Sequence, residues 1–394
     1  FSDTVRRLSR SHRPAGFEVS GGLDSSAVFC LAEGLLRSGS LLAPAIEGYT
    51  LAFPDDEAAN ELEYVRAVGE MLGRAVREVP PTRMSLAWYR EEAAFFRDFP
   101  GYPNGTMSLG LRRLAWQDGC RVLLGGGGGD EWLGGCGLRT YYAEELAAGR
   151  WRNAGACLRH DLAEVGVAET GAALLRSGVF PLLPASVQRA ARYVRGKALR
   201  RGREPGAAGT DWLAGPLREA LLERRRAGEA AARLDGLAPG RRYLRRRLTN
   251  AYGALAKELE ERAASRVGLE LRHPMNDSWL VELAFAMPER FRQRGRVSKY
   301  VHVEAMKGIL PERVRTRPTK ADFSTVFRRQ LDGEAMARLR EIPARRPHWV
   351  RADRAEAAFG SYEEATGEGG PGGGAGLQWL LWNLLACDQL CAGG

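Results

Sequence analysis

Several sequence features are missing from this 394-residue chain, and each absence excludes a class of protein. No apolar run approaches the roughly 18 residues that a membrane-spanning helix requires. The six cysteines form no CxxC pair, which argues against a zinc site or a thioredoxin-type motif. Such cysteine usage is typical of the reducing cytoplasm, where we expect the protein to work. Cys30 and Cys120 lie in apolar contexts, which predicts small core residues.

The net charge of +10 is concentrated in one region, residues 186–247, which is rich in arginine. No zinc-finger spacing and no aromatic-studded strand motif accompanies this charge, so we expect no nucleic-acid partner. The composition favours solvated helix faces. The alternative interpretation is a docking surface for an acidic peptide or a nucleic acid.

Hydrophobic periodicity divides the chain into an alternating part and a helical part. Strands separated by helices predict an α/β fold with a doubly wound, mostly parallel sheet, whose ligands bind at the carboxyl ends of the strands. The remainder is expected to be helical, with loops at 203–209 and 366–376 and an apolar helix at 377–390. The alternating part has strands at 16–19, 48–53, 75–80 and 120–126, and helices at 26–39, 56–73 and 107–119.

The first glycine-rich turn, SGGLDSS at residues 20–26, has the character of a phosphate-binding loop. It has no lysine, so it is not a Walker loop. Its glycines allow backbone amides to approach an anion, and the following helix adds a positive N-terminal end. A carboxylate repels phosphate unless Mg²⁺ lies between them. The predicted nucleotide-binding residues of this turn are Ser20, Gly21, Gly22, Asp24, Ser25 and Ser26.

The second glycine-rich turn, LLGGGGGDEWLGG at residues 123–135, also follows a predicted strand. Its five consecutive glycines are explained either by close approach of the backbone to a ligand or by flexibility. Asp130 at its end supplies a second carboxylate, which we expect to face the first turn. Asp24 and Asp130 would then share a magnesium ion bound to one triphosphate.

Four motifs in combination resemble the synthetase domain of asparagine synthetase, a member of the ATP-pyrophosphatase enzymes. The resemblance implies that ATP is cleaved between its α and β phosphates, that a carboxylate becomes an acyl-adenylate, and that an amine then attacks to give an amide and AMP. ATP and Mg²⁺ are the implied cofactors. The motifs are SGGLDSS, LLGGGGGDEWLGG, RHPMNDSWLVELAFAMP (272–288) and SKYVHVEAMKGILPERVRTRPTKADFS (298–324).

The resemblance also implies roles for individual residues. Lys320 matches the family's lysine, whose ammonium would stabilise negative charge on the α-phosphate and the tetrahedral intermediate. Arg272 and Asp277 would shape the acceptor side or brace it. Further implied residues are Lys299 and Glu304 as supporting catalytic residues, and Thr50, Leu51, Gly125 and Gly126 beside the adenine nucleotide.

Departures from asparagine synthetase point to a different acceptor. Gly127 stands where that enzyme has a glutamate and where β-lactam synthetases usually have a tyrosine. RHPMND replaces the usual R-x-P-F-L-D. The glycine-rich turn together with KADFS is more similar to lasso peptide cyclases, and a small residue at 127 and a glycine-rich segment at 366–376 would give room to a bulky peptide.

The sequence thus predicts an ATP-dependent ligase that adenylates an Asp or Glu side chain of a precursor peptide and closes a macrolactam with the peptide's own amino terminus. A leader peptidase and a precursor-recognition protein are expected partners. An asparagine synthase-like amidotransferase, a β-lactam synthetase-like enzyme and a non-enzymatic scaffold are the alternatives. The expected parts are a nucleotide-binding core (1–140), an arginine-rich helical region (141–265) and the rest of the synthetase domain (266–394), with a glutaminase-like domain possible before Phe1.

Overall fold

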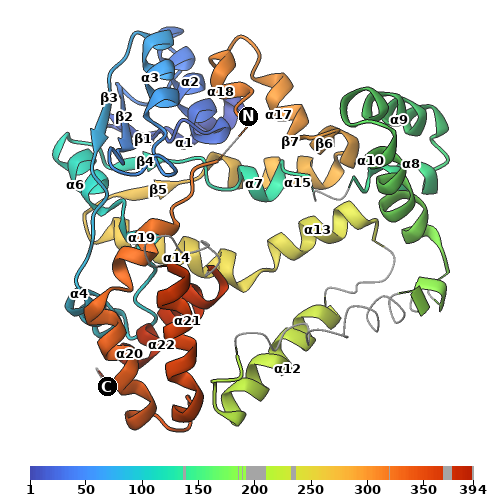
Figure 1. The fold of residues 1–394 in the computed structure, drawn as a ribbon. Helices are drawn as coiled ribbons and strands as arrows, with labels where there is room; N and C mark the ends of the chain where they lie inside the picture. The colour runs from blue at the N-terminus through green and yellow to red at the C-terminus, as the bar shows by residue number, and fades with distance from the viewer. Residues whose placement is uncertain are drawn as a thin grey trace. The chain divides into compact units, whose positions relative to one another are not determined.

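The computed structural model (Figure 1) contains two compact units, each made from three stretches of the chain. Unit 1 comprises Phe1–Pro81, Leu109–Arg192 and Leu234–Ala321, and unit 2 comprises Thr82–Ser108, Tyr193–Arg233 and Asp322–Gly394. The residues that the structure describes are 1–135, 139–184, 186–188, 190–191, 210–231, 237–318, 320–366 and 375–392.

Unit 1 is built on a five-stranded sheet with the order β3-β2-β1-β4-β5, in which all neighbours are parallel. The order reverses between β1 and β4, and β1 is paired with β4 so that Phe17 lies opposite Leu124. Ligands of such sheets bind where the order reverses, beyond the carboxyl ends of the strands. The strands are β1 (Ala15–Glu18), β2 (Ile46–Leu51), β3 (Val76–Val79), β4 (Val122–Leu124) and β5 (Glu270–Arg272).

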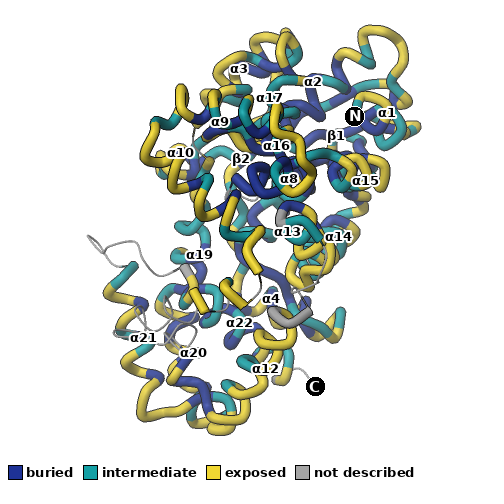
Figure 2. The backbone as a smooth tube through the Cα atoms, turned by 90° about the vertical axis from the view of Figure 1, so that its right-hand side faces the viewer, coloured by how far each residue is buried: buried dark blue, intermediate teal, exposed yellow. Residues whose placement is uncertain are grey.

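Helices cover the sheet because its central strands β1 and β4 are buried on both faces, as parallel strands usually are. Phe17 of β1 packs against Phe29 of the following helix, with ring centroids 5.6 Å apart. Figure 2 shows the buried backbone around β1 and α2 in dark blue. Helices of unit 1 that follow or precede a strand of this sheet in the chain include α2 (Leu23–Arg37), α3 (Leu62–Leu72), α6 (Leu109–Gln117) and α14 (Ala251–Ser265), and α1 (Ser2–Leu8) precedes β1.

The rest of unit 1 is largely helical and carries the segments that complete the site. Its helices are α7 (Gly129–Trp132), α8 (Tyr141–Ala147), α9 (Trp151–Val165), α10 (Val167–Ala173), α13 (Pro239–Leu248), α15 (Ser278–Ala286), α16 (Glu289–Arg292), α17 (Tyr300–Ala305) and α18 (Glu312–Arg315). It also contains the helical turns η1 (Leu174–Val179), η2 (Phe180–Leu182) and η3 (Pro274–Asn276), and a hairpin of β6 (Gln293–Arg294) with β7 (Val297–Ser298).

The described part of unit 2 consists mainly of helices that pack through aromatic side chains. Trp382 lies in T-shaped contact with Tyr89, and Trp379 lies against Phe327 with ring centroids 4.5 Å apart. The apolar helix predicted at 377–390 is therefore present as α22 and is packed as expected. The helices of this unit are α4 (Leu86–Phe96), α5 (Pro103–Thr106), α12 (Gly215–Ala231), α19 (Ser324–Gln330), α20 (Gly333–Arg345), α21 (Ala352–Thr366) and α22 (Ala375–Ala392).

The predicted fold class is confirmed, and each predicted strand and helix of the alternating part is present, although the helix predicted at 56–73 begins only at Leu62. The short strand β5 was not predicted. The predicted loop at 203–209 and residues 367–374 of the second predicted loop lie outside the described residues, while Thr366 and Gly376 prove helical. Cys30 and Cys120 are buried, as predicted. Among the described residues, no helix is long and apolar enough to cross a membrane.

Candidate active site

The two glycine-rich turns meet where the sheet order reverses, because β1 and β4 are neighbours and each turn follows one of them. A Cβ atom on Gly126 would lie 2.5 Å from the backbone nitrogen of Ser25. A Cβ atom on Gly129 would lie within 2.5 Å of both carboxylate oxygens of Asp24. Side chains at these positions would separate the turns. Gly126 and Gly129 therefore allow the second turn to pack closely on the first.

The first turn is held in a fixed shape by its serines and by α3. Ser25 Oγ accepts a hydrogen bond from the backbone nitrogen of Ser20 at 3.0 Å, and the two side-chain oxygens lie 2.8 Å apart. Gly21 has a φ of +70°, and a Cβ there would lie 2.7 Å from Cβ of Tyr64. Glycine is therefore required by both its backbone conformation and its neighbour. Gly22 is the N-cap of α2, so the turn presents the positive end of that helix.

Four charged side chains from distant parts of the chain converge beyond these turns. The ammonium group of Lys299 binds Asp24 Oδ2 and lies 2.6 Å from Asp130 Oδ1. The ammonium group of Lys320 binds the other oxygen of Asp130. We name Asp24, Asp130, Lys299 and Lys320 the four-charge cluster. Its two carboxylates share one lysine, so the expected convergence of Asp24 and Asp130 is present in the structure.

The cluster runs from a buried end to an exposed end. The side chains of Asp24 and Lys299 are 14% and 10% exposed, whereas that of Lys320 is 73% exposed. Burial raises the pKa of Asp24, and Lys299 opposes that rise. Burial also disfavours the ionised form of Asp130, but the two lysines outweigh it and lower its pKa to about 2. Burial disfavours the charged form of Lys299, yet the two carboxylates raise its pKa.

A magnesium ion fits the chemistry of this cluster but would need further oxygen ligands. Among the described residues, no group of three or more His, Cys, Asp or Glu side chains stands together as a metal site. Asp24 Oδ1 is buried and has no hydrogen-bond partner within the described part of the chain, so it remains available as a metal ligand. Carboxylates combined with phosphate oxygens form the usual protein site for Mg²⁺.

The other predicted nucleotide residues lie at the strand ends. Thr50 is buried, and its hydroxyl is 3.4 Å from the carbonyl oxygen of Leu51, the last residue of β2. The backbone nitrogen of Gly125 donates to the carbonyl oxygen of Arg272, which carries the sheet pairing past the end of β4. Ser26 Oγ is buried and has no hydrogen-bond partner among the described residues.

Arg272 and Asp277 brace the N-terminal segment. The guanidinium group of Arg272 donates to the carbonyl oxygens of Leu8 and Arg10, at 2.9 and 2.7 Å. Asp277 caps α15 through the backbone nitrogen of Trp279 and pairs with Arg7 at 3.1 Å. Of the two implied roles, these contacts support bracing rather than direct contact with an acceptor.

Glu304 does not join the four-charge cluster through any contact. One of its carboxylate oxygens lies 2.6 Å from the ammonium group of Lys307, and the other lies 4.0 Å from Arg315. Its neighbour on the same helix is more directly placed. His302, which the sequence analysis did not single out, lies with Nε2 3.5 Å from Asp24 Oδ1. The i,i+3 spacing of Lys299 and His302 across the start of α17 was the available signal.

Arg317 was also not predicted, although it stands in the same motif as Lys320. It forms a salt bridge with Glu61, and its guanidinium lies 4.2 Å from the ring centroid of Tyr64. Tyr64 is the residue that Gly21 packs against. This contact fastens the segment leading to Lys320 onto α3 and the first turn.

Gly127 is exposed, but the space beside it is not open on every side. A Cβ atom at this position would lie 3.0 Å from Nδ1 of His273. His273 therefore borders the space beside Gly127 on one side, and the expectation that the small residue at 127 leaves room for a bulky peptide stays a prediction. His273 belongs to the RHPMND motif, and nothing in the sequence alone connected it with Gly127.

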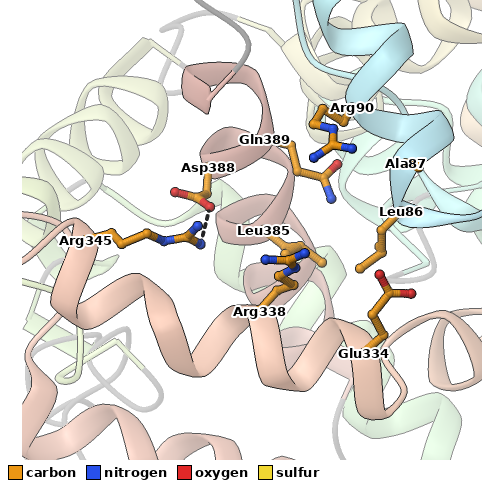
Figure 3. A pocket seen from close by; sticks show the side chains of 9 residues that line it. All are labelled: Leu86, Ala87, Arg90, Glu334, Arg338, Arg345, Leu385, Asp388 and Gln389. Carbon is orange, nitrogen blue, oxygen red and sulfur yellow. Dashed lines mark hydrogen bonds and ion pairs between the residues drawn. The ribbon is translucent and has the colours of Figure 1, made fainter.

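A separate pocket lies within unit 2, between α4, α20 and α22 (Figure 3). Its volume is about 110 Å³. Arg345 binds Asp388 across its wall at 2.7 Å. The pocket contains no predicted site residue; its lining residues are Leu86, Ala87, Arg90, Glu334, Arg338, Arg345, Leu385, Asp388 and Gln389.

Comparison with known proteins gives a family and two partial relatives. Residues 1–390 match the family described as Asparagine synthase. A stretch of 142 residues is 28% identical to Amidase chry2 of Gibberella zeae and 30% identical to Amidase chyE of Penicillium rubens. Each match covers 34% of this chain and 21% of the relative, so the chain spans about a fifth of the length of these curated relatives.

Proposed function

This chain belongs to the asparagine synthase family, whose members are ATP-dependent ligases that form amide bonds, and on that premise we propose that it is a macrolactam synthetase of the lasso peptide cyclase kind. It would adenylate an Asp or Glu side chain of a linear precursor peptide with release of pyrophosphate. The amino terminus of the same peptide would then attack, giving a cyclic amide and AMP. The convergence of the four-charge cluster on the two glycine-rich turns is the observation that carries this proposal.

The residues of the site divide the work by charge. The amides of the first turn and the start of α2 would bind the leaving pyrophosphate, since a helix N-terminus favours anions. Lys320, exposed and paired with Asp130, can exchange that partner for the α-phosphate, where it would stabilise the charge that develops. Asp24 and Asp130 would hold Mg²⁺, which when bound would neutralise phosphate charge.

Two features favour a peptide substrate over aspartate and ammonia. Gly127 replaces the glutamate that asparagine synthetase uses with its small acceptor, and RHPMND replaces its usual acceptor motif. The arginine-rich helix α13 packs on α7, the helix that carries Asp130. Its guanidinium groups suit a peptide that brings a carboxylate to the site. A leader peptidase and a precursor-recognition protein would be the partners of such an enzyme.

The direct test uses the purified chain, ATP, Mg²⁺ and a library of synthetic linear peptides. Each peptide has a free amino terminus and one internal Asp or Glu at a varied distance from it. We expect at least one peptide to give a product lighter by one water, with equal amounts of AMP and pyrophosphate. Recovery of ADP and phosphate would contradict the mechanism.

Two lysine variants distinguish a catalytic role of Lys320 from the nonspecific effect of removing one positive charge. Lys320→Ala should lose product formation about a thousandfold, in the range that loss of an electrostatic stabiliser costs. Lys307→Ala removes an exposed lysine that pairs with Glu304, and it should leave the rate unchanged. Pyrophosphate release driven by aspartate plus ammonium would instead support an asparagine synthase-like amidotransferase. Lys320→Ala acting no worse than the wild type would support a scaffold.

A further inference from the structure

His273 presents two ring nitrogens that the fold leaves unused. It follows β5 and is the N-cap of η3. Both nitrogens are buried, and neither has a hydrogen-bond partner among the residues that the structure describes. Buried polar atoms are normally paired, so an unpaired imidazole calls for an explanation.

The imidazole is placed against the second glycine-rich turn. A Cβ on Gly127 would lie 3.0, 3.5 and 3.7 Å from Nδ1, Cε1 and Cγ of His273. The ring edge carrying Nδ1 therefore lies in tight contact with the place where a side chain of residue 127 would begin. Asn276 fixes this peptide by donating from Nδ2 to the carbonyl oxygen of Gly127 at 3.2 Å. Asp130 of the four-charge cluster follows three residues later on the same turn.

Charges around His273 come from four elements. Glu18 ends β1, and its Oε2 lies 3.3 Å from the position of a Cβ on Gly125, which is itself 4.0 Å from Nδ1 of His273. Burial lowers the pKa of His273; Glu18 and Glu131 of α7 oppose that shift, whereas Lys257 of α14 and Arg112 of α6 add to it. The imidazole is accordingly neutral at pH 7 and able to accept a proton.

The four-charge cluster itself offers no unpaired base, and His302 beside it binds protons too weakly, since burial and Lys299 lower its pKa to about 3. Both of its carboxylates bind lysine ammonium groups, and its other two members are cations. A neutral imidazole beside the same turn complements this cluster, because amide formation requires an amine to lose a proton.

We propose that His273 is the general base of the amide-forming step, which deepens the proposed function and rests on it. The nitrogen of the peptide's amino terminus forms a bond to the acyl carbon of the adenylate, and its proton passes to Nδ1 of His273. The bond between the acyl carbon and the AMP oxygen then breaks, and AMP leaves. The imidazolium returns its proton to solvent.

The test separates the two half-reactions with the peptide library, ATP and Mg²⁺. Peptide-dependent exchange between ATP and pyrophosphate reports adenylation, and cyclic product reports amide formation. His273→Asn should retain exchange within about threefold and lose cyclisation by about 100-fold or more, as removal of a general base does. We expect the cyclisation rate of the wild type to rise with pH, and this rise should disappear in the variant.

A second variant and a control protect the test from misfolding. Gly127→Ala presses a methyl group onto Nδ1, and it should reduce cyclisation about tenfold with exchange unchanged. His12→Asn changes an exposed histidine and should behave as the wild type. If His273→Asn does not fold, Gly127→Ala alone decides.

The outcomes distinguish this inference from the proposed function. Cyclisation at the wild-type rate in both variants, or an equal loss of exchange and cyclisation, would overturn the role of His273 alone. No peptide-dependent exchange in the wild type would overturn the proposed function, and this inference with it.

Discussion

Two groups of charged side chains lie beside the second glycine-rich turn, and they differ in whether their buried polar atoms are paired. In the four-charge cluster each carboxylate binds an ammonium group. We name the second group the Glu18 cluster; it consists of Glu18, Arg112, Glu260 and His273. Several buried polar atoms of this cluster have no hydrogen-bond partner among the described residues. Arg112 Nε approaches Glu18 Oε1 only to 3.6 Å.

The difference suits the four-charge cluster to the exchange of ion-pair partners and the Glu18 cluster to proton transfer. Paired charges can swap their partners for phosphate or metal without leaving a bare ion, since buried charges require compensation. Displaced pKa values are typical of functional acids and bases, and in the Glu18 cluster Glu260 and His273 have them. Burial raises the pKa of Glu260 to about 7 and lowers that of His273.

The largest expected effect comes from breaking the four-charge cluster at its carboxylates. Asp24→Asn and Asp130→Asn should each reduce AMP formation about a thousandfold, because Lys299 loses a partner and a predicted metal ligand is removed. Peptide-dependent AMP release measures this. Asp353→Asn, an exposed aspartate in unit 2, is the control, and an equal loss in that variant would show that the effect is not specific.

The second-largest effect is expected from a steric change at the contact between the two glycine-rich turns. Gly129→Ala would drive a methyl group into the carboxylate of Asp24. Overpacking of this kind typically costs about 1–3 kcal/mol of stability, and displacement of Asp24 should slow AMP formation about 100-fold. Urea unfolding and AMP release measure the two effects. Gly155→Ala in α9, where an added Cβ meets no atom within 4 Å, should cost neither; a harmless Gly129→Ala would refute the close packing.

The Glu18 cluster can be probed through the pH dependence of stability. The folded state raises the pKa of Glu260 from 4.5 to about 7, because burial opposes its ionisation. The stability from this group is therefore full below about pH 4.5 and lost as pH rises through 7, a change of about 3 kcal/mol. Glu260→Gln should remove this loss.

Urea unfolding of both proteins at pH 4.5 and pH 8 checks the expected difference. The variant should gain stability relative to the wild type on going to pH 8. A constant difference between the two proteins at both pH values would contradict a raised pKa at Glu260.

The smallest effect on AMP formation is expected at Glu304, and this prediction tests whether Glu304 lies outside the four-charge cluster. Its carboxylate lies beside Lys307 and Arg315 rather than beside the cluster. An exposed pair of this kind contributes little to stability. Glu304→Gln should therefore change the rate of AMP formation by less than about threefold. A loss comparable to that of Asp130→Asn would assign Glu304 a direct role.

Local patterns predicted much of the fold because helices and strands differ in their hydrophobic period. The strand β5 was missed since two of its three residues, Glu270 and Arg272, are charged, so it lacks the apolar run that marked β4. The bounds of α2 were also shifted: the helix begins at Leu23, within the turn, since Gly22 ends the extended backbone. Element ends depend on cap conformation, which periodicity does not encode.

The candidate site was predicted through its motifs, while its pairings were not. The glycine-rich turns pointed to Asp24 and Asp130, but nothing local indicated that Lys299 would bind both. The same holds for Arg317, whose partner Glu61 lies far away in the chain.

The sequence by itself determined most of the order of strands and helices along the chain, the family and the positions of the two glycine-rich turns, since each depends on short-range pattern. Only the tertiary structure decided which charges meet, why the second turn consists of glycines, and that His273 stands beside Gly127. These are contacts between residues far apart in the chain, and their existence depends on how the parallel strands bring the two turns to one edge of the sheet.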